Sequence, residues 1–219
     1  MGDFHPAVEE YLETIYELEE AGIVPMRARI VERLGVSAPS VSETVKRLER
    51  EGYLTLSETK AMVLTESGRK YATDMVRRHR LAERLLVDVL HVPWHQVHEE
   101  ACRLEHAISD NLEAHLVALL GDPASCPHGN PIPGSANPLP PGEVVSLSRA
   151  SVGASTEVRR IDEQLEADPS GLLLLERSDL MPGSALVVGA RSADGVAVTT
   201  SAGEVSVPES VASLVYVLA

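Results

Sequence analysis

Two short helices joined by a tight turn are predicted by residues 27–50, which read RARIVERLGVSAPSVSETVKRLER. Ser37 is a good N-cap residue and can start the second helix. Val41, Val45 and Leu48 have the i, i+4, i+7 spacing of a buried helix face, which leaves the charged residues of this helix facing solvent. This arrangement is typical of a helix-turn-helix.

The flanking segments complete a larger unit. An amphipathic helix is predicted over residues 6–20, where apolar residues recur at helical spacing. Residues 53–56 and 61–64 are two short β-prone runs joined by a polar turn, which predicts a β-hairpin. A helix, a helix-turn-helix and a hairpin in succession follow the winged helix-turn-helix plan. We therefore assign residues 1–72 to a winged helix-turn-helix domain.

A helical region is predicted next, from residue 65 to about residue 120. Residues 81–90 contain more leucine and valine than one surface helix needs, which indicates a subunit interface or, equally well, a core stripe against the first domain. Residues 122–142 contain seven prolines and three glycines, as expected for an extended linker. We assign residues 73–140 to a helical domain that ends in this linker.

The remainder of the chain changes character. Over residues 144–218, short apolar runs of strand length alternate with turn signals such as Asp194-Gly195. This pattern predicts a small β-barrel domain over residues 141–219. The whole chain is therefore predicted to be an α+β multidomain protein.

Charge is unevenly distributed along the chain, whose formal net charge is −14. Residues 26–80 carry twelve Lys and Arg against seven acids, whereas residues 81–219 carry seven against nineteen. One basic surface is thus expected to meet phosphate, with a solvated helix face as the alternative. No apolar run approaches the roughly 18 residues of a membrane span, and the N-terminus lacks the features of a secretory signal. We expect a cytoplasmic protein with its two cysteines reduced.

Seven of the eight histidines fall within residues 79–128. Four metal-binding side chains share one face of a single predicted helix: His98, Cys102, Glu105 and His106. His79 and Glu83 form an i, i+4 pair on the preceding helix. Thiolate, carboxylate and imidazole donors together suit Fe(II), Mn(II), Co(II), Ni(II) or Zn(II) and disfavour calcium and magnesium. Two other functions use the same donors: a zinc hydrolase with Glu83 as base, or a metal buffer.

Several ungapped segments resemble the diphtheria toxin repressor family of iron- and manganese-dependent regulators. The segments are YLETIYELEE at 11–20, the turn from residue 27 to 37, RHRLAERLL at 78–86, VHEEACRLEHAISD at 97–110 and GNPIPG at 129–134. The resemblance is close over residues 6–134 and loose beyond them. It implies a non-enzymatic, homodimeric repressor of metal-homeostasis genes that binds a palindromic operator. It also implies a helical dimerisation and metal-binding domain and a flexibly tethered SH3-like domain.

The resemblance implies two sites per subunit for Fe(II) or Mn(II). The residues that match the primary, regulatory site are Glu10, Cys102, Glu105 and His106. Those that match the ancillary site are His79, Glu83 and His98, and the SH3-like domain offers Glu163 and Glu166, unless these form only a solvated acidic segment.

The primary set is a hybrid within the family. Iron-type members have Met at the position of Glu10, and manganese-type members have an acid at that position and Glu at the position of Cys102. The carboxylate makes the site harder and the thiolate keeps it attractive to softer ions. We expect Fe(II), followed by Mn(II), with a manganese-specific regulator as the alternative.

The expected DNA interface has two groups of residues. The side chains expected to meet phosphates are Arg27, Arg29, Lys46, Arg47, Arg50 and the wing residue Lys60. Those expected near base edges are Ser37, Pro39, Ser40 and Glu43. Iron-type members have Gln at the position of Glu43. Because a carboxylate accepts from cytosine N4 but cannot pair bidentately with adenine, we expect a different operator.

The donor set predicts a switch. A metal ligated by Glu10 and by donors of the helical domain fixes the angle between two domains, and in a dimer that angle sets the spacing of the recognition helices, about 34 Å or a multiple of it. The SH3-like domain is expected to contact the Pro-rich segment, because SH3-like folds bind polyproline II strands. Tyr216 is its single aromatic residue, and a simple linker is the alternative.

Overall fold

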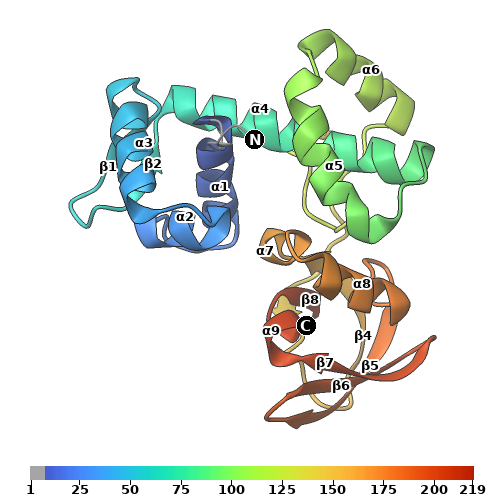
Figure 1. Ribbon diagram of the computed structural model, residues 1–219. Helices are drawn as coiled ribbons and strands as arrows, with labels where there is room; N and C mark the ends of the chain where they lie inside the picture. The colour runs from blue at the N-terminus through green and yellow to red at the C-terminus, as the bar shows by residue number, and fades with distance from the viewer. Residues whose placement is uncertain (1–7) are drawn as a thin grey trace. The chain divides into compact units, whose positions relative to one another are not determined.

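The computed structural model describes residues 8–219. The chain divides into two compact units, and the boundary in the sequence lies between Arg77 and Arg78. Helix α4 (Glu66–Arg84) runs from the first unit into the second (Figure 1). Within the described residues, no helix combines the length and the apolar character that a membrane span requires.

The N-terminal unit is a winged helix-turn-helix, as predicted. Its elements are α1 (Val8–Glu20), α2 (Arg27–Leu34), α3 (Ala38–Arg50), β1 (Leu54–Leu56) and β2 (Met62–Leu64), followed by α4. The backbone N–H of Ser40 donates to the Ser37 hydroxyl, which caps α3. Gly35, with φ at 64°, makes the left-handed turn between α2 and α3. Residues 6 and 7 of the predicted first helix lie outside the described residues.

The core of this unit fixes the orientation of α3. Tyr11 and Ile15 of α1 belong to the same buried cluster as Val41, Val45 and Leu48 of α3. Each such side chain contributes about 1.5–3 kcal/mol when it is removed from water. The buried face of α3 is therefore fixed, and its polar face is exposed.

The helical part of the second unit is more broken than the sequence predicts. After α4 the chain forms a π-helical segment, η1 (Leu85–Val89), within the region predicted to be helical. The next helix divides into η2 (Trp94–Gln96), α5 (Val97–Leu104) and η3 (Glu105–Ala107), and α6 (Asp110–Leu120) follows. The apolar residues of segment 81–90 differ in burial: Leu86 is buried, whereas Val89 and Leu90 are 41% and 58% exposed.

The C-terminal domain is built on one antiparallel sheet of six strands. The strands are β3 (Val144–Ser146), β4 (Ser155–Ile161), β5 (Ala185–Ser192), β6 (Gly195–Thr200), β7 (Gly203–Pro208) and β8 (Val215–Leu218), in the order β3-β8-β4-β5-β6-β7. Three helices, which the sequence did not predict, accompany the sheet (Figure 1): α7 (Glu163–Glu166), α8 (Pro169–Arg177) and α9 (Glu209–Ala212).

Residues 122–135 are not the extended linker that their composition predicts. Cys126, His128 and Asn130 are buried, and only the stretch from residue 136 to 144 is exposed throughout. The His128 carbonyl accepts from the backbone N–H of Ile161 at 2.8 Å, and the indole of Trp94 donates to the Pro127 carbonyl at 3.1 Å. The C-terminal domain therefore contacts the helical domain, because the bond between Ile161 and His128 crosses the junction and Trp94 packs into the C-terminal core.

Candidate functional site

Several segments of the second unit bring together side chains of the kinds that bind metals, of which five are buried, His98 is half-buried and Cys102 is exposed. They are the end of α4, the helix α5, the turn at residues 126–128 and the short helix α7. The side chains they contribute are His79 and Glu83, His98 and Cys102, Cys126 and His128, and Glu166. We call these seven residues the buried centre.

Four of the predicted ancillary residues form one compact set. Ligand atoms of His79, Glu83, His98 and Glu166 all lie within 4.8 Å of one another. Nε2 of His79 is 3.4 Å from Oε1 of Glu83, and Nδ1 of His98 is 3.4 Å from Oε2 of Glu166. The helical spacing of His79 and Glu83 puts both on one face of α4, while Glu166 comes from the C-terminal domain.

A second set shares the Glu83 carboxylate and was missed in the sequence. Ligand atoms of Glu83, Cys126 and His128 lie within 4.8 Å of one another. Nδ1 of His128 is 3.1 Å from Oε1 of Glu83 and 3.1 Å from Oε2 of Glu166. The Cys126-Pro127-His128 spacing was the available signal, but it lies in the Pro-rich segment that was interpreted as linker.

The hydrogen-bonding needs of the buried centre are not met by protein atoms alone. Five of its buried side-chain atoms lack a hydrogen-bond partner: His79 Nε2, Glu83 Oε2, His98 Nδ1, His128 Nε2 and Glu166 Oε2. Native proteins rarely leave such atoms unpaired, and each one needs an explanation. Imidazole and carboxylate atoms in this arrangement fit a divalent transition metal.

Neighbouring groups of opposite charge shift the pKa values of the imidazoles and carboxylates in this centre. Burial acts to lower the pKa of His128, but the carboxylates of Glu166 and Glu83 outweigh it and hold that pKa well above its ordinary value. His79 and His98 are shifted in the same direction. Burial acts to raise the pKa of Glu83, and the neighbouring imidazoles hold it well below its ordinary value. The imidazolium and carboxylate groups therefore neutralise one another in the protein without metal.

The two acids predicted from the SH3-like domain have different partners. Glu166 faces His98 and His128, as described above, and accepts a hydrogen bond from Asn130 at 2.6 Å. Glu163 instead accepts from Nε and Nη2 of Arg80, at 3.1 and 2.7 Å. Arg80 is fully buried, and no sequence pattern pointed to this role. Of the two acids, Glu166 therefore lies among the imidazoles, whereas Glu163 pairs with Arg80.

Of the predicted primary donors in the second unit, Cys102 belongs to the buried centre, and Glu105 and His106 lie beside it. Cys102 Sγ is 3.7 Å from His98 Nε2, and His79 Nδ1 is 2.5 Å from Glu105 Oε2. His106 Nε2 is 3.4 Å from Glu105 Oε1. These contacts lie within the second unit.

The remaining primary donor belongs to the other unit. Glu10 lies in the first turn of α1, in the N-terminal unit.

Hydrogen bonds from the His79 and His98 imidazoles overcome the effect of burial and lower the pKa of Cys102 to about 7, which favours a thiolate. Cys102, His98 and Glu166 line a cavity of about 410 Å³, through which solvent reaches this side of the buried centre.

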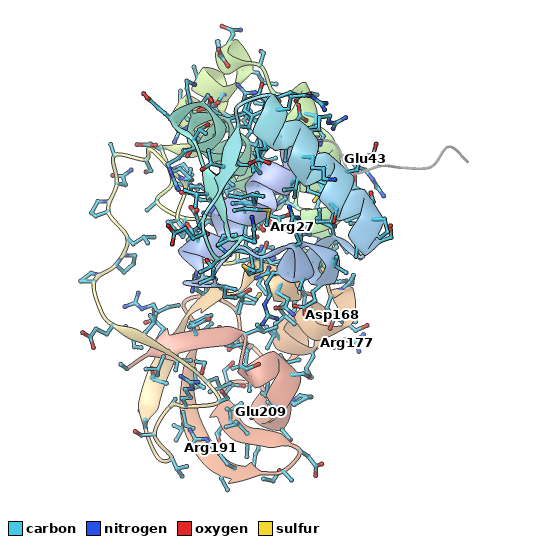
Figure 2. All side chains as sticks on the ribbon, turned by 90° about the vertical axis from the view of Figure 1, so that its left-hand side faces the viewer. Arg27, Glu43, Asp168, Arg177, Arg191 and Glu209 are labelled. Atoms are coloured by element: carbon cyan, nitrogen blue, oxygen red, sulfur yellow. The ribbon has the colours of Figure 1, made fainter. Side chains whose placement is uncertain are left out.

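The predicted DNA-binding residues lie on the outer face of the N-terminal unit. Eight of them are exposed, namely Arg29, Ser37, Pro39, Glu43, Lys46, Arg47, Arg50 and Lys60, and Arg27 and Ser40 are half-buried. Figure 2 labels Arg27 at the start of α2 and Glu43 on α3. Lys60 lies in the turn between β1 and β2 and has φ at 65°. Arg29 pairs with Glu32 at 2.6 Å, which partly neutralises its charge.

Two protein-family models match the chain. The model of the iron dependent repressor N-terminal DNA binding domain matches residues 3–62. The model of the iron dependent repressor metal binding and dimerisation domain matches residues 65–134. The chain is 40% identical to the iron-dependent repressor IdeR of Mycobacterium tuberculosis strain H37Rv, over 99% of each chain. It is 41% identical to the diphtheria toxin repressor of Corynebacterium diphtheriae, over 84% of each.

Solved structures give the same result. A manganese-dependent transcriptional repressor in complex with manganese has a TM-score of 0.84 and 36% identity, over 97% of this chain and all of the other. The IdeR of T. acidophilum has a TM-score of 0.76 and 28% identity, over 96% of each chain. The similarity therefore extends through the C-terminal domain.

Proposed function

Because this chain belongs to the iron-dependent repressor family and is an iron- or manganese-dependent transcriptional repressor, we propose that it acts as a cytoplasmic homodimer on a palindromic operator of metal-homeostasis genes. Its family is one of repressors and not of enzymes. Exposed apolar residues support a homodimer: Leu90 and Leu119 are 58% and 62% exposed.

The observation that carries this proposal is the set of five buried imidazole and carboxylate atoms that lack a hydrogen bond in the buried centre. We assign an ancillary site to His79, Glu83, His98 and Glu166, and we add Cys126 and His128 as the alternative ligands that share Glu83 and Glu166. Glu163 is a weaker candidate, because its Oε1 accepts from Arg80 and only its Oε2, which has no hydrogen-bond partner, is open to a ligand. A bound divalent cation would supply the positive charge that three protonated imidazoles supply without it.

The primary, regulatory site is proposed to consist of Glu10, Cys102, Glu105 and His106. The lowered pKa of Cys102 supports a thiolate ligand at neutral pH. Since Glu10 belongs to the N-terminal unit and the other three to the second, shared ligation would couple the two units. Such coupling is typically worth about 1–3 kcal/mol per site. The mixed donor set favours Fe(II), with Mn(II) next.

On DNA, the exposed face of α3 is proposed to enter the major groove. Lys46, Arg47 and Arg50 would meet phosphates together with Arg27, Arg29 and the wing residue Lys60. Ser37, Pro39, Ser40 and Glu43 would approach base edges. In a twofold dimer the two copies of α3 would bind half-sites about 34 Å, or a multiple of this, apart.

The contact between the SH3-like domain and the Pro-rich segment is proposed to run through the turn at residues 128–130. It is supported by the hydrogen bond from the Ile161 N–H to the His128 carbonyl and by one from the Asn130 amide to the Ile161 carbonyl, at 2.9 Å. This contact would hold Glu166 against the helical domain.

DNA binding under controlled metal supply tests the proposed function. Fluorescence anisotropy would be measured anaerobically with Fe(II), Mn(II) or a chelator, on a duplex selected from a random library by the metal-loaded protein. Cys102→Ala and His106→Ala should each abolish the metal response and leave the fold intact by circular dichroism. His115→Ala is the matched control, because this imidazole is exposed on α6 and bonds only to its own helix at Asn111. A metal response retained in the Cys102 or His106 variant would refute the primary-site assignment.

A further inference from the structure

Tyr11 has a buried hydroxyl group with no hydrogen-bond partner among the described residues. The residue is 1% exposed, and its ring belongs to the core of the N-terminal unit. Buried tyrosine hydroxyls usually find a partner, and an unpaired one costs stability. Packing accounts for the ring, but it gives no reason for the hydroxyl.

The same side chain lines a hollow beside α3. This hollow has a volume of about 390 Å³, and the α3 residues around it include the cations Lys46, Arg47 and Arg50. Glu43 is the acid among its lining residues. Three cations and one acid give the hollow a net positive charge, which suits an anion.

We propose that Tyr11 is a DNA-binding residue, whose hydroxyl donates to a backbone phosphate oxygen brought into this hollow by Arg47 and Arg50. The proposal rests on the DNA-binding function of the family and extends it to a residue of the helix that precedes the helix-turn-helix. A phosphate oxygen is a strong acceptor, and charge-assisted hydrogen bonds are about twice as strong as neutral ones. Because Tyr11 is 1% exposed in the protein without DNA, the contact requires the side chains around the hollow to move when DNA binds.

The test is Tyr11→Phe in the full-length, manganese-saturated protein. Affinity would be measured on the selected duplex and on a random duplex, over a series of KCl concentrations. We expect binding to both duplexes to weaken about five- to tenfold, since a phosphate contact carries no sequence information. The slope of log K against log salt should stay unchanged, because a phenol displaces no counterion. Arg47→Ala should lower that slope by about 0.9.

Two further measurements separate this role from a structural one. The melting temperature of Tyr11→Phe should equal or exceed that of the wild type, because the change removes an unpaired polar atom and keeps the ring. Tyr53→Phe is the matched control: this half-buried tyrosine belongs to the same unit, packs against Tyr71 at 5.9 Å between ring centroids, and does not line the hollow. It should leave DNA affinity unchanged.

Three results would overturn the proposal. Unchanged DNA affinity in Tyr11→Phe would show that the hydroxyl does not contact DNA. Loss on the selected duplex alone would mean that it orients a base-reading side chain such as Glu43. A lower melting temperature would mean that the hydroxyl already has a partner in the free protein. Failure of the wild type to bind DNA with metal would instead count against the proposed metal dependence.

Discussion

Glu163 and Glu166 provide a matched pair of substitutions that separates metal binding from packing. Both carboxylates are buried on the four-residue helix α7, and each can be replaced by the isosteric glutamine. Glu166 faces two imidazoles of the buried centre, whereas Glu163 faces Arg80. We expect Glu166→Gln to weaken metal binding and Glu163→Gln to weaken the fold.

The contacts set the magnitudes. Losing Glu166 removes the negative charge that lies 3.4 Å from His98 and 3.1 Å from His128. The loss of one such group typically lowers metal affinity 10- to 100-fold, or about 1.4–2.7 kcal/mol. Glu163→Gln weakens two charged hydrogen bonds from Arg80, for which we expect about 2 kcal/mol and a fall in melting temperature of roughly 4–8 °C. Burial already raises the pKa of Glu163, so we expect no larger loss.

Both quantities are measurable in one protein preparation. Mn(II) affinity would be obtained by competition with a chelating dye, and stability by urea unfolding with EDTA. Trp94, the single tryptophan of the chain, packs on the His128 ring at 4.7 Å between centroids, so its emission reports on the buried centre. Equal losses of Mn(II) affinity in the two variants would refute this account of α7.

Two further predictions concern the turn at residue 129 and the response to pH. Gly129→Ala should lower stability by about 2–4 kcal/mol in urea unfolding, because Gly129 has φ at 89° and a Cβ would lie 2.1 Å from the Arg159 carbonyl oxygen. Gly153→Ala, also at positive φ but with open space around it, should lose less; equal losses would contradict the prediction. Without metal, the three imidazoles with raised pKa values stabilise the fold fully below pH 6.5, and this contribution is lost as the pH rises through those pKa values. The two carboxylates with lowered pKa values stabilise the fold fully above pH 4.5, and this contribution is lost as the pH falls. The lowered pKa of Cys102 acts in the opposite direction above about pH 7, but this one thiol opposes three imidazoles. The chelated protein should therefore have its highest melting temperature between pH 4.5 and 6.5, and a melting temperature that increases steadily above pH 6.5 in EDTA would contradict this. Metal affinity should increase with pH, because metal displaces protons.

Local signals in the sequence were enough to predict the fold of the N-terminal unit. The cap at Ser37, the spacing of Val41, Val45 and Leu48, and the hairpin that follows act over a few residues, so they could be read without knowledge of the rest of the chain. The i, i+4 pair of His79 and Glu83 is local in the same sense. The spacing of His98, Cys102, Glu105 and His106 on one helix face is local too. The resemblance supplied Glu10, Glu163 and Glu166.

Long-range packing decided what the sequence left open. Glu163 and Glu166 lie three residues apart, and only the position of α7 makes one a partner of Arg80 and the other a neighbour of His98. Cys126 and His128 belong to a segment whose composition indicates a linker. They are buried because the C-terminal sheet and Trp94 provide hydrogen bonds to the backbone around them. The composition of a segment indicates only whether it would be extended and solvent-exposed on its own. The partners that bury this segment are distant in sequence, so only the tertiary structure could bring them together.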